Sequence, residues 1–223
     1  MLDIASNIRK LRHQIPPAVK IVAVSKTKPV SAVMEAYSSG QRIFGENRVQ
    51  ELLQKKDLLP SDIEWHLIGH LQTNKVKLVV PVADMIQSVD SFRLLKAINA
   101  EASKINRTVN CLLQFYIADE ETKYGFSPDE AEKMLDSDEF RAIKSVRICG
   151  VMGMASFVDD AEQIRREFRN LAGCFERLKS HYFAEEDSFR EISMGMSGDY
   201  EIAIGEGSTM VRIGSLIFGS RNK

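Results

Sequence analysis

The chain has 223 residues, of which 44% are hydrophobic and 27% are charged, values that suit a folded protein with a sizeable core. Its 30 Lys and Arg residues nearly balance 31 Asp and Glu residues, so the net charge is −1 and the basic excess typical of proteins that bind nucleic acids or acidic membranes is absent. The length favours one α/β domain over residues 1–223, because α/β barrels commonly contain about 200–250 residues.

Neither the N-terminus nor the cysteines indicate export. Met1–Ile4 has no basic segment followed by an apolar one, and the sequence contains no run of about 18 apolar residues. Cys111, Cys149 and Cys174 are widely spaced and form no CxxC motif, which argues against a disulfide framework or a cysteine metal site. We therefore expect a cytoplasmic protein that has no membrane segment.

Apolar spacing predicts an N-terminal helix, followed by strands and helices that alternate. The helix, Leu2–His13, ends before Pro16-Pro17. Short apolar runs bounded by turn residues predict eight strands: Lys20–Ser25, Arg42–Gly45, Glu64–Ile68, Asp84–Val89, Val109–Tyr116, Val146–Met152, Phe189–Met194 and Met210–Ile213. Helical stretches separate them: Val30–Ser39, Glu46–Leu59, Thr73–Val80, Ser91–Asn106, Ser127–Leu135, Asp159–His181 and the short Gly198–Ile204. The acidic run Asp119–Lys123 predicts a solvated loop.

This alternation predicts the fold class. Strands that alternate strictly with helices imply a parallel sheet. Eight strands favour closure into a single (β/α)8 barrel of the TIM type, with the N-terminal helix as an addition. A doubly wound open sheet is the alternative that the pattern leaves open.

Lys26 follows the first predicted strand. Val22, Val24 and Lys26 share one face of that strand, because side chains alternate with a period of two. If the valines face the barrel interior, Lys26 points into its mouth, where functional residues of such barrels cluster. Removal from water lowers the pKa of an amine and lets it attack an aldehyde. A lysine that extends into solvent from a strand end is the alternative interpretation.

Small polar segments adjoin the last two predicted strands. Barrel enzymes often bind phosphate with the loops after their seventh and eighth strands. Ser197 and Gly198 would open a short helix there, while Gly214 and Ser215 would supply close backbone approach and a hydroxyl group. A serine helix cap and a tight turn are the structural alternatives.

Four other polar residues are candidates for a functional role. Arg212 lies within the last strand and needs a buried partner, either a ligand or a carboxylate such as Glu206. Asn47 follows the second strand and could bind a ligand or cap the next helix. His66 and His70 are four residues apart, but they span a strand and a loop without an obvious third ligand. We therefore predict no metal site.

Seven blocks of the sequence, taken in order, resemble the pyridoxal phosphate homeostasis protein family, which comprises single-domain relatives of alanine racemase. The blocks span nearly the whole chain: Ala23–Pro29, Phe44–Asn47, Trp65–Lys75, Lys123–Phe126, Gly150–Met154, Met194–Asp199 and Arg212–Gly219. The resemblance implies a barrel like the N-terminal domain of alanine racemase, and pyridoxal 5′-phosphate (PLP) as the cofactor.

The resemblance also implies a role for individual residues. It implies that Lys26 holds PLP as a Schiff base and that the phosphate is bound by Ser197, Gly198, Gly214 and Ser215. It further implies that Arg212 faces the pyridine nitrogen and that Asn47 and Met152 line the ring pocket. Lys28 and Lys123 are candidates for regulating or exchanging the cofactor.

Two functions follow from this resemblance. The first is a monomeric PLP carrier with no catalytic residue, which buffers PLP in the cell and transiently contacts PLP-dependent apo-enzymes. The second is a PLP-dependent racemase or related enzyme with weak activity. Racemisation by two bases needs a proton donor opposite the lysine; alanine racemase takes it from an added domain, for which a chain ending at Lys223 leaves no room. A phosphosugar isomerase barrel would explain the phosphate loops but not Lys26.

Overall fold

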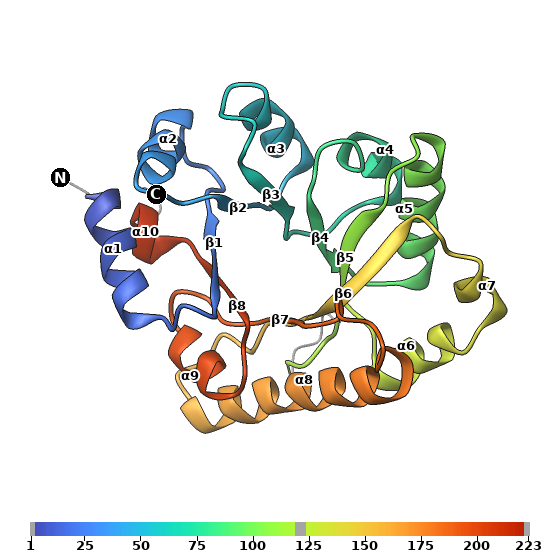
Figure 1. Ribbon diagram of the computed structural model, residues 1–223. Helices are drawn as coiled ribbons and strands as arrows, with labels where there is room; N and C mark the ends of the chain where they lie inside the picture. Colours follow the sequence, from blue (N-terminus) through green and yellow to red (C-terminus); the bar gives the residue numbers. More distant parts are fainter. Residues whose placement is uncertain (1–2, 119–123, 221–223) are drawn as a thin grey trace.

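Eight parallel strands close into a barrel in the computed structural model, which describes residues 3–118 and 124–220. The strands follow one another around the barrel in chain order, and β8 pairs with β1 to complete the ring (Figure 1). The predicted (β/α)8 barrel is therefore confirmed. The open-sheet alternative is wrong, because an open sheet would leave its edge strands unpaired.

The strands are β1 (Lys20–Val24), β2 (Ile43–Glu46), β3 (Glu64–Leu67), β4 (Met85–Val89), β5 (Val109–Gln114), β6 (Val146–Met152), β7 (Glu191–Ser193) and β8 (Met210–Ile213). The helices are α1 (Ile4–Gln14), α2 (Val30–Ser38), α3 (Val49–Lys56), α4 (Val76–Val79), α5 (Phe92–Lys104), α6 (Pro128–Leu135), α7 (Asp138–Arg141), α8 (Ala161–Tyr182), α9 (Tyr200–Gly205) and α10 (Ser215–Phe218), with a 3-10 turn at Thr73–Lys75. Among the described residues, no helix combines the length and apolar character needed to cross a bilayer.

Differences from the predicted elements lie at the ends of strands and helices and in short helices; β7, for example, is Glu191–Ser193 rather than Phe189–Met194. The helix α3 begins at Val49 rather than Glu46, because Glu46 completes β2. The predicted helix at Thr73–Val80 divides into the 3-10 turn and the single-turn α4. The single-turn α7 was not predicted, since one turn is too short to show helical periodicity. The predicted loop at Asp119–Lys123 lies outside the described residues.

Apolar residues pack both inside the barrel and between the barrel and its helices. The interior cluster consists of Val22, Met85, Leu112, Cys149, Met152 and Met210. The outer layer is larger and includes Phe44, Trp65 and the buried face of α1, formed by Ile4, Ile8 and Leu11. The predicted additional N-terminal helix is present, and it lies beside α10 (Figure 1), where Asn7 Nδ2 donates a hydrogen bond to the carbonyl of Ile217.

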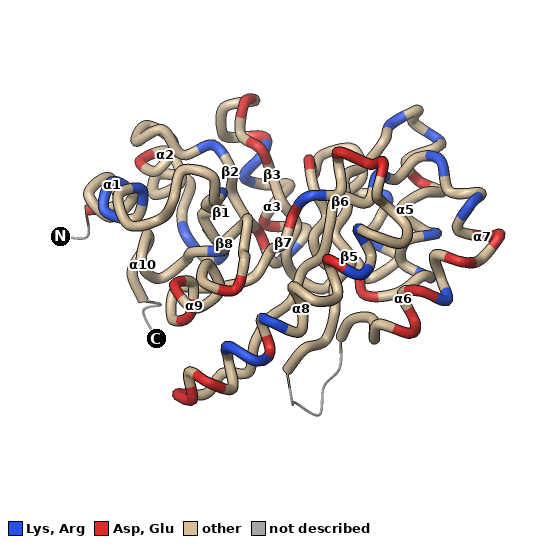
Figure 2. Tube along the Cα trace, turned by 60° about the horizontal axis from the view of Figure 1, so that its bottom comes forward, with Lys and Arg blue, Asp and Glu red and all other residues tan. Residues whose placement is uncertain are grey.

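Ion pairs hold α8 against the end of α9. Glu206 accepts hydrogen bonds from Arg165 Nη1 at 3.1 Å and from Arg169 Nε at 3.0 Å. Acidic and basic residues both occur along α8 (Figure 2). The hydrogen bond from Arg169, followed by that from Arg165, holds the pKa of the Glu206 carboxyl below its usual range.

This lowered pKa predicts a pH-dependent contribution to stability. A carboxyl group whose pKa is lower in the folded state stabilises the fold above the unfolded pKa, about 4.3 for Glu, and loses that contribution as the pH falls through the folded pKa. As the pH falls below about 4, we expect the unfolding free energy of Glu206→Gln to decrease less than that of the wild type. The effect at neutral pH should be small, because Arg169 is largely exposed and solvent screens the pair. Urea denaturation between acid and neutral pH measures it, and an unchanged pH dependence would contradict the prediction.

Candidate functional site

A pocket of about 600 Å³ opens at the carboxyl ends of the strands. Seven of the eight residues predicted to form a site line it: Lys26, Asn47, Ser197, Gly198, Arg212, Gly214 and Ser215. The eighth, Met152, is fully buried in the interior cluster and is not among the lining residues. The loop after β6, which includes Met154, Phe157 and Val158, forms a further part of the lining that we did not predict. Its sequence signal is a group of apolar residues between a strand and a helix.

Lys26 reaches the pocket because of the side-chain alternation in β1. Val22 belongs to the interior cluster, whereas Val24 and Lys26 line the pocket above it, as the period of two predicted. Lys26 is half-buried. The next residue, Thr27, has a φ of +64°, a left-handed conformation that β-branched residues rarely adopt.

Arg212 crosses the floor of the pocket and is almost completely buried. Its Nη1 donates to the carbonyl and the hydroxyl of Ser193, both at 2.7 Å, and its Nη2 donates to the carbonyl of Gly153 at 2.9 Å. Burial lowers the pKa of Arg212 to about 10, so the side chain remains charged at neutral pH. The alternative prediction that Glu206 pairs with Arg212 is wrong, because Glu206 binds Arg165 and Arg169 of α8.

A chain of hydrogen bonds continues from Arg212 through the barrel interior. Ser193 Oγ donates to Gln87 Oε1 at 2.6 Å, and Gln87 Nε2 lies 2.7 Å from His66 Nδ1. His66 Nε2 in turn lies 2.9 Å from Glu64 Oε1, and this hydrogen bond holds the pKa of Glu64 below its usual range. These hydrogen bonds fix the position of the guanidinium group from the side of the barrel interior.

The two histidines considered for a metal site have different hydrogen-bond partners. His66 belongs to the interior chain, whereas His70 hydrogen-bonds to Asp90 at 2.8 Å and its ring packs against Tyr124. Within residues 3–118 and 124–220, no group of three or more His, Cys, Asp or Glu side chains is arranged to hold a metal ion.

The loops after β7 and β8 are joined by Ser197. Its hydroxyl accepts hydrogen bonds from the N–H groups of Gly214 at 3.3 Å and Leu216 at 3.4 Å. The N–H groups of Gly198 and Ser215 donate to no group in the described part of the chain, and a Cβ at Gly198 would meet nothing within 4 Å. Such N–H groups can bind an anion.

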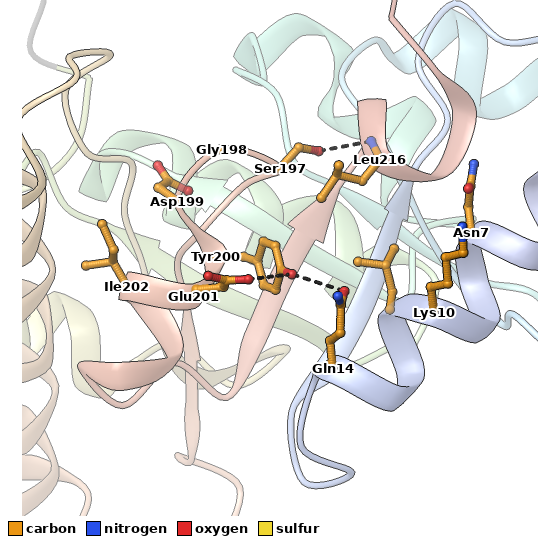
Figure 3. Close-up of a pocket in the computed structure, with 11 residues that line it drawn as sticks. Asn7, Lys10, Gln14, Ser197, Gly198, Asp199, Tyr200, Glu201, Ile202 and Leu216 are labelled. Carbon is orange, nitrogen blue, oxygen red and sulfur yellow. Dashed lines mark hydrogen bonds between the residues drawn. The ribbon is translucent and has the colours of Figure 1, made fainter.

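Helix α9 starts later than predicted. Asp199 occupies its N-cap position and α9 begins at Tyr200, so Ser197 and Gly198 precede the helix instead of opening it. The same segment also lines a second hollow of about 520 Å³ (Figure 3). Lys10 and Gln14 of α1 line this hollow opposite Tyr200.

Asn47 does not take its structural alternative, and Lys28, which also lines the pocket, binds the end of α10. Asn47 does not cap α3, whose N-cap residue is Arg48. Its Oδ1 atom is buried and has no hydrogen-bond partner among the described residues. Lys28 Nζ donates to the carbonyls of Phe218 at 2.8 Å and Gly219 at 3.3 Å, at the end of α10. Lys123, the other candidate for cofactor exchange, lies outside the described residues.

Comparison with known proteins identifies relatives along the whole chain. The family model for the alanine racemase N-terminal domain matches residues 2–222. The pyridoxal phosphate homeostasis protein of Haemophilus influenzae is 38% identical over 234 residues, which cover 99% of this chain and 97% of the relative. That of Escherichia coli K12 is 36% identical and covers 100% of this chain and 98% of the relative.

The chain belongs to the pyridoxal phosphate homeostasis protein family. PipY of Synechococcus elongatus PCC7942 has a similar structure: without PLP it superimposes with a TM-score of 0.91 at 36% identity, covering 97% of this chain and 100% of PipY. With PLP bound, PipY gives a TM-score of 0.87 at 35% identity over the same shares. An alanine racemase of Clostridium difficile, 12% identical, shares the fold with a TM-score of 0.79, and the match covers 99% of this chain but 57% of the racemase. The homeostasis-family barrel thus corresponds to one part of the racemase.

Proposed function

We propose that this protein binds PLP reversibly in the cytoplasm, buffers its concentration and delivers it to PLP-dependent apo-enzymes through transient contacts, acting as a monomer. The observation that carries the proposal is a single pocket in which a lysine, a buried arginine and two small polar loops meet. The relatives named pyridoxal phosphate homeostasis protein and the PLP-bound structure of PipY support it.

The polar groups of the pocket fit this cofactor. A phosphate group needs several hydrogen-bond donors, and the N–H groups of Gly198 and Ser215 have no partner in the described ranges. The exposed Gly198 leaves open space beside its backbone. The ring of PLP carries a hydroxyl group, and the orphaned Oδ1 of Asn47 is an acceptor without a donor. A site with such unmet hydrogen bonds favours a polar ligand.

Lys26 is the residue that would bind the cofactor covalently. When PLP is bound, its aldehyde carbon forms a C=N bond with Lys26 Nζ and one water molecule leaves, so hydrolysis of the same bond releases the cofactor. The half-buried position of Lys26 lets its amine reach the pocket while water retains access. Reversible storage requires an amine that reaches the cofactor and water that can hydrolyse the bond.

Arg212 bears on how strongly the bound ring could withdraw electrons. We propose that the guanidinium faces the pyridine nitrogen, where a fixed positive charge disfavours protonation of that nitrogen. An unprotonated ring withdraws electrons weakly, which disfavours carbanion chemistry on bound amino acids. Met152 immediately precedes Gly153, whose carbonyl binds Arg212, so we propose that Met152 supports the floor of the pocket from within the barrel.

Titration with PLP and with pyridoxal, which lacks the phosphate, tests the proposal. We expect PLP to bind with a yellow absorbance band and to leave a covalent adduct after borohydride reduction. Pyridoxal should bind at least about 10-fold more weakly, because a hydrogen bond to a charged group contributes about 1.5–3 kcal/mol. No PLP adduct, or equal affinity for both compounds, would refute the proposed site. Sustained racemisation of a panel of amino acids would refute the carrier role.

A further inference from the structure

A buried cluster of charged residues lies behind the pocket, on the outer side of β1 and β2. Lys55 of α3 is almost completely buried and donates three hydrogen bonds: to the carbonyl of Ser25 at 2.7 Å, to Glu46 Oε1 at 2.7 Å and to Glu51 Oε1 at 2.8 Å. Ser25 Oγ also donates to Glu46 Oε1, at 2.6 Å. We call Lys55, Glu46 and Glu51 the β1–β2 clamp.

The clamp binds both peptide groups that flank Lys26. The carbonyl of Ser25 belongs to the peptide group before Lys26, and it accepts from Lys55. The N–H of Thr27 belongs to the peptide group after Lys26, and it donates to Glu51 Oε1 at 2.5 Å. Lys55 and Glu51 therefore fix the backbone on the two sides of the lysine, and Glu46 holds Lys55 in place.

The conformation of Thr27 shows that this local backbone is held under strain. A φ of +64° costs of order 1–3 kcal/mol in a residue other than glycine and persists only where surrounding contacts enforce it. The hydrogen bond from Thr27 N–H to Glu51 is such a contact. The strained residue directly follows Lys26, whose side chain lines the pocket.

The clamp also joins the two strand ends that carry pocket residues. Ser25 precedes Lys26 and Glu46 precedes Asn47, so the outward-facing pair linked by Ser25 Oγ stands behind two residues that line the pocket. Of the clamp residues, Glu51 contacts the backbone beside Lys26, whereas Glu46 adjoins Asn47, so a change at Glu51 acts on Lys26.

Stability alone is a poor explanation for the clamp. Glu46 Oε2 is buried without a partner among the described residues, and burial raises the pKa of Glu46 above its usual range. Buried ion pairs often contribute no more to stability than apolar residues of the same size, because removing the charges from water is costly. An incompletely satisfied buried carboxylate therefore points to a positional role.

We propose that Lys55, Glu46 and Glu51 are positioning residues that fix the backbone of Lys26 so that its amine meets the aldehyde carbon of PLP. This inference rests on the proposed function. It assigns to α3, which does not contribute to the pocket lining, control over the covalent step and not over phosphate binding.

The matched variants Glu51→Ala and Glu51→Gln test this role. Gln keeps an oxygen acceptor for Thr27 N–H, whereas Ala removes it. Each variant is titrated with PLP and with 4-deoxypyridoxine 5′-phosphate, which has the ring and the phosphate but no aldehyde. We expect Glu51→Ala to weaken PLP binding by about 10-fold or more, because small displacements of a reacting group are costly, and to leave binding of the aldehyde-free compound close to that of the wild type. Glu51→Gln should restore most of the PLP affinity.

Further variants and a structure complete the test. Lys55→Met should reproduce the effect of Glu51→Ala if it folds, and a crystal structure of Glu51→Ala apoprotein should show Thr27 at negative φ. The control is Lys20→Met. Lys20 lies at the start of β1 and pairs with Glu191 of β7, so this variant should leave PLP affinity unchanged.

Two results would overturn the inference while the proposed function stands: wild-type PLP affinity in Glu51→Ala, or equal weakening of PLP and the aldehyde-free compound. If the wild-type protein itself forms no borohydride-reducible link at Lys26, the proposed function fails and the positioning role fails with it.

Discussion

Replacing Lys26 by alanine should abolish the covalent attachment of PLP and, with it, the yellow absorbance band. The C=N bond requires a primary amine at the pocket, and Lys26 lies there at the end of β1. The proposed phosphate-binding groups and Arg212 remain in the variant, so weak non-covalent binding should persist. Mass spectrometry after borohydride reduction should show the PLP adduct on the wild-type protein and none on Lys26→Ala.

A lysine distant from the pocket provides the control for this experiment. Lys96 pairs with Glu139 on the surface, so Lys96→Ala should retain the full adduct. An adduct of unchanged stoichiometry on Lys26→Ala, located on Lys28 or another lysine, would show that Lys26 is not the attachment site.

Replacing Gly150 by alanine should have one of the largest effects on stability of any single substitution in this chain. Gly150 lies in β6 with a φ of +147°, and a Cβ there would stand 1.9 Å from the carbonyl oxygen of Glu191 in the neighbouring strand β7. The overlap is with backbone, which cannot rotate away, so β6 and β7 must separate. We expect a loss of about 4 kcal/mol or more in unfolding free energy, the range of severe single substitutions.

Urea denaturation measures this loss, and Gly173→Ala is the matched control. Gly173 lies within α8, and its added Cβ would meet nothing within 4 Å. Alanine favours helix more than glycine does, so this variant should gain up to about 1 kcal/mol. The prediction fails if the unfolding free energy of Gly150→Ala lies within about 1 kcal/mol of the wild-type value, which is the typical effect of an ordinary substitution.

The carbonyl contacts of Arg212 illustrate a limit of the sequence. Its position within an apolar strand predicted a buried arginine, and the structure bears this out. The partner, however, is Ser193 with the carbonyl of Gly153, not a carboxylate. A residue's burial follows from its own strand pattern, but its partner depends on which atoms the neighbouring strands bring within 3 Å.

Met152 and Asn47 also show that the sequence alone does not determine which side chains line the pocket. Both follow or end a strand, and both were expected to line one pocket. Asn47 does so, while Met152 faces the barrel interior. The register of β5 against β6 shifts between Cys111 and Leu112, and a shift of this kind changes which side chains face inward. Such irregularities arise from contacts between strands and leave no periodic signal.

The sequence by itself determined the alternation of strands and helices, the position of Lys26 after the first strand, and membership of a family through seven ordered blocks. These are local properties, since side-chain period and turn residues act over a few neighbouring positions. Only the tertiary structure decided that Lys55 and Glu51 hold the backbone around Lys26. These contacts join residues 30 and 24 positions apart, which meet because β1 pairs with β2 and α3 packs against this pair of strands.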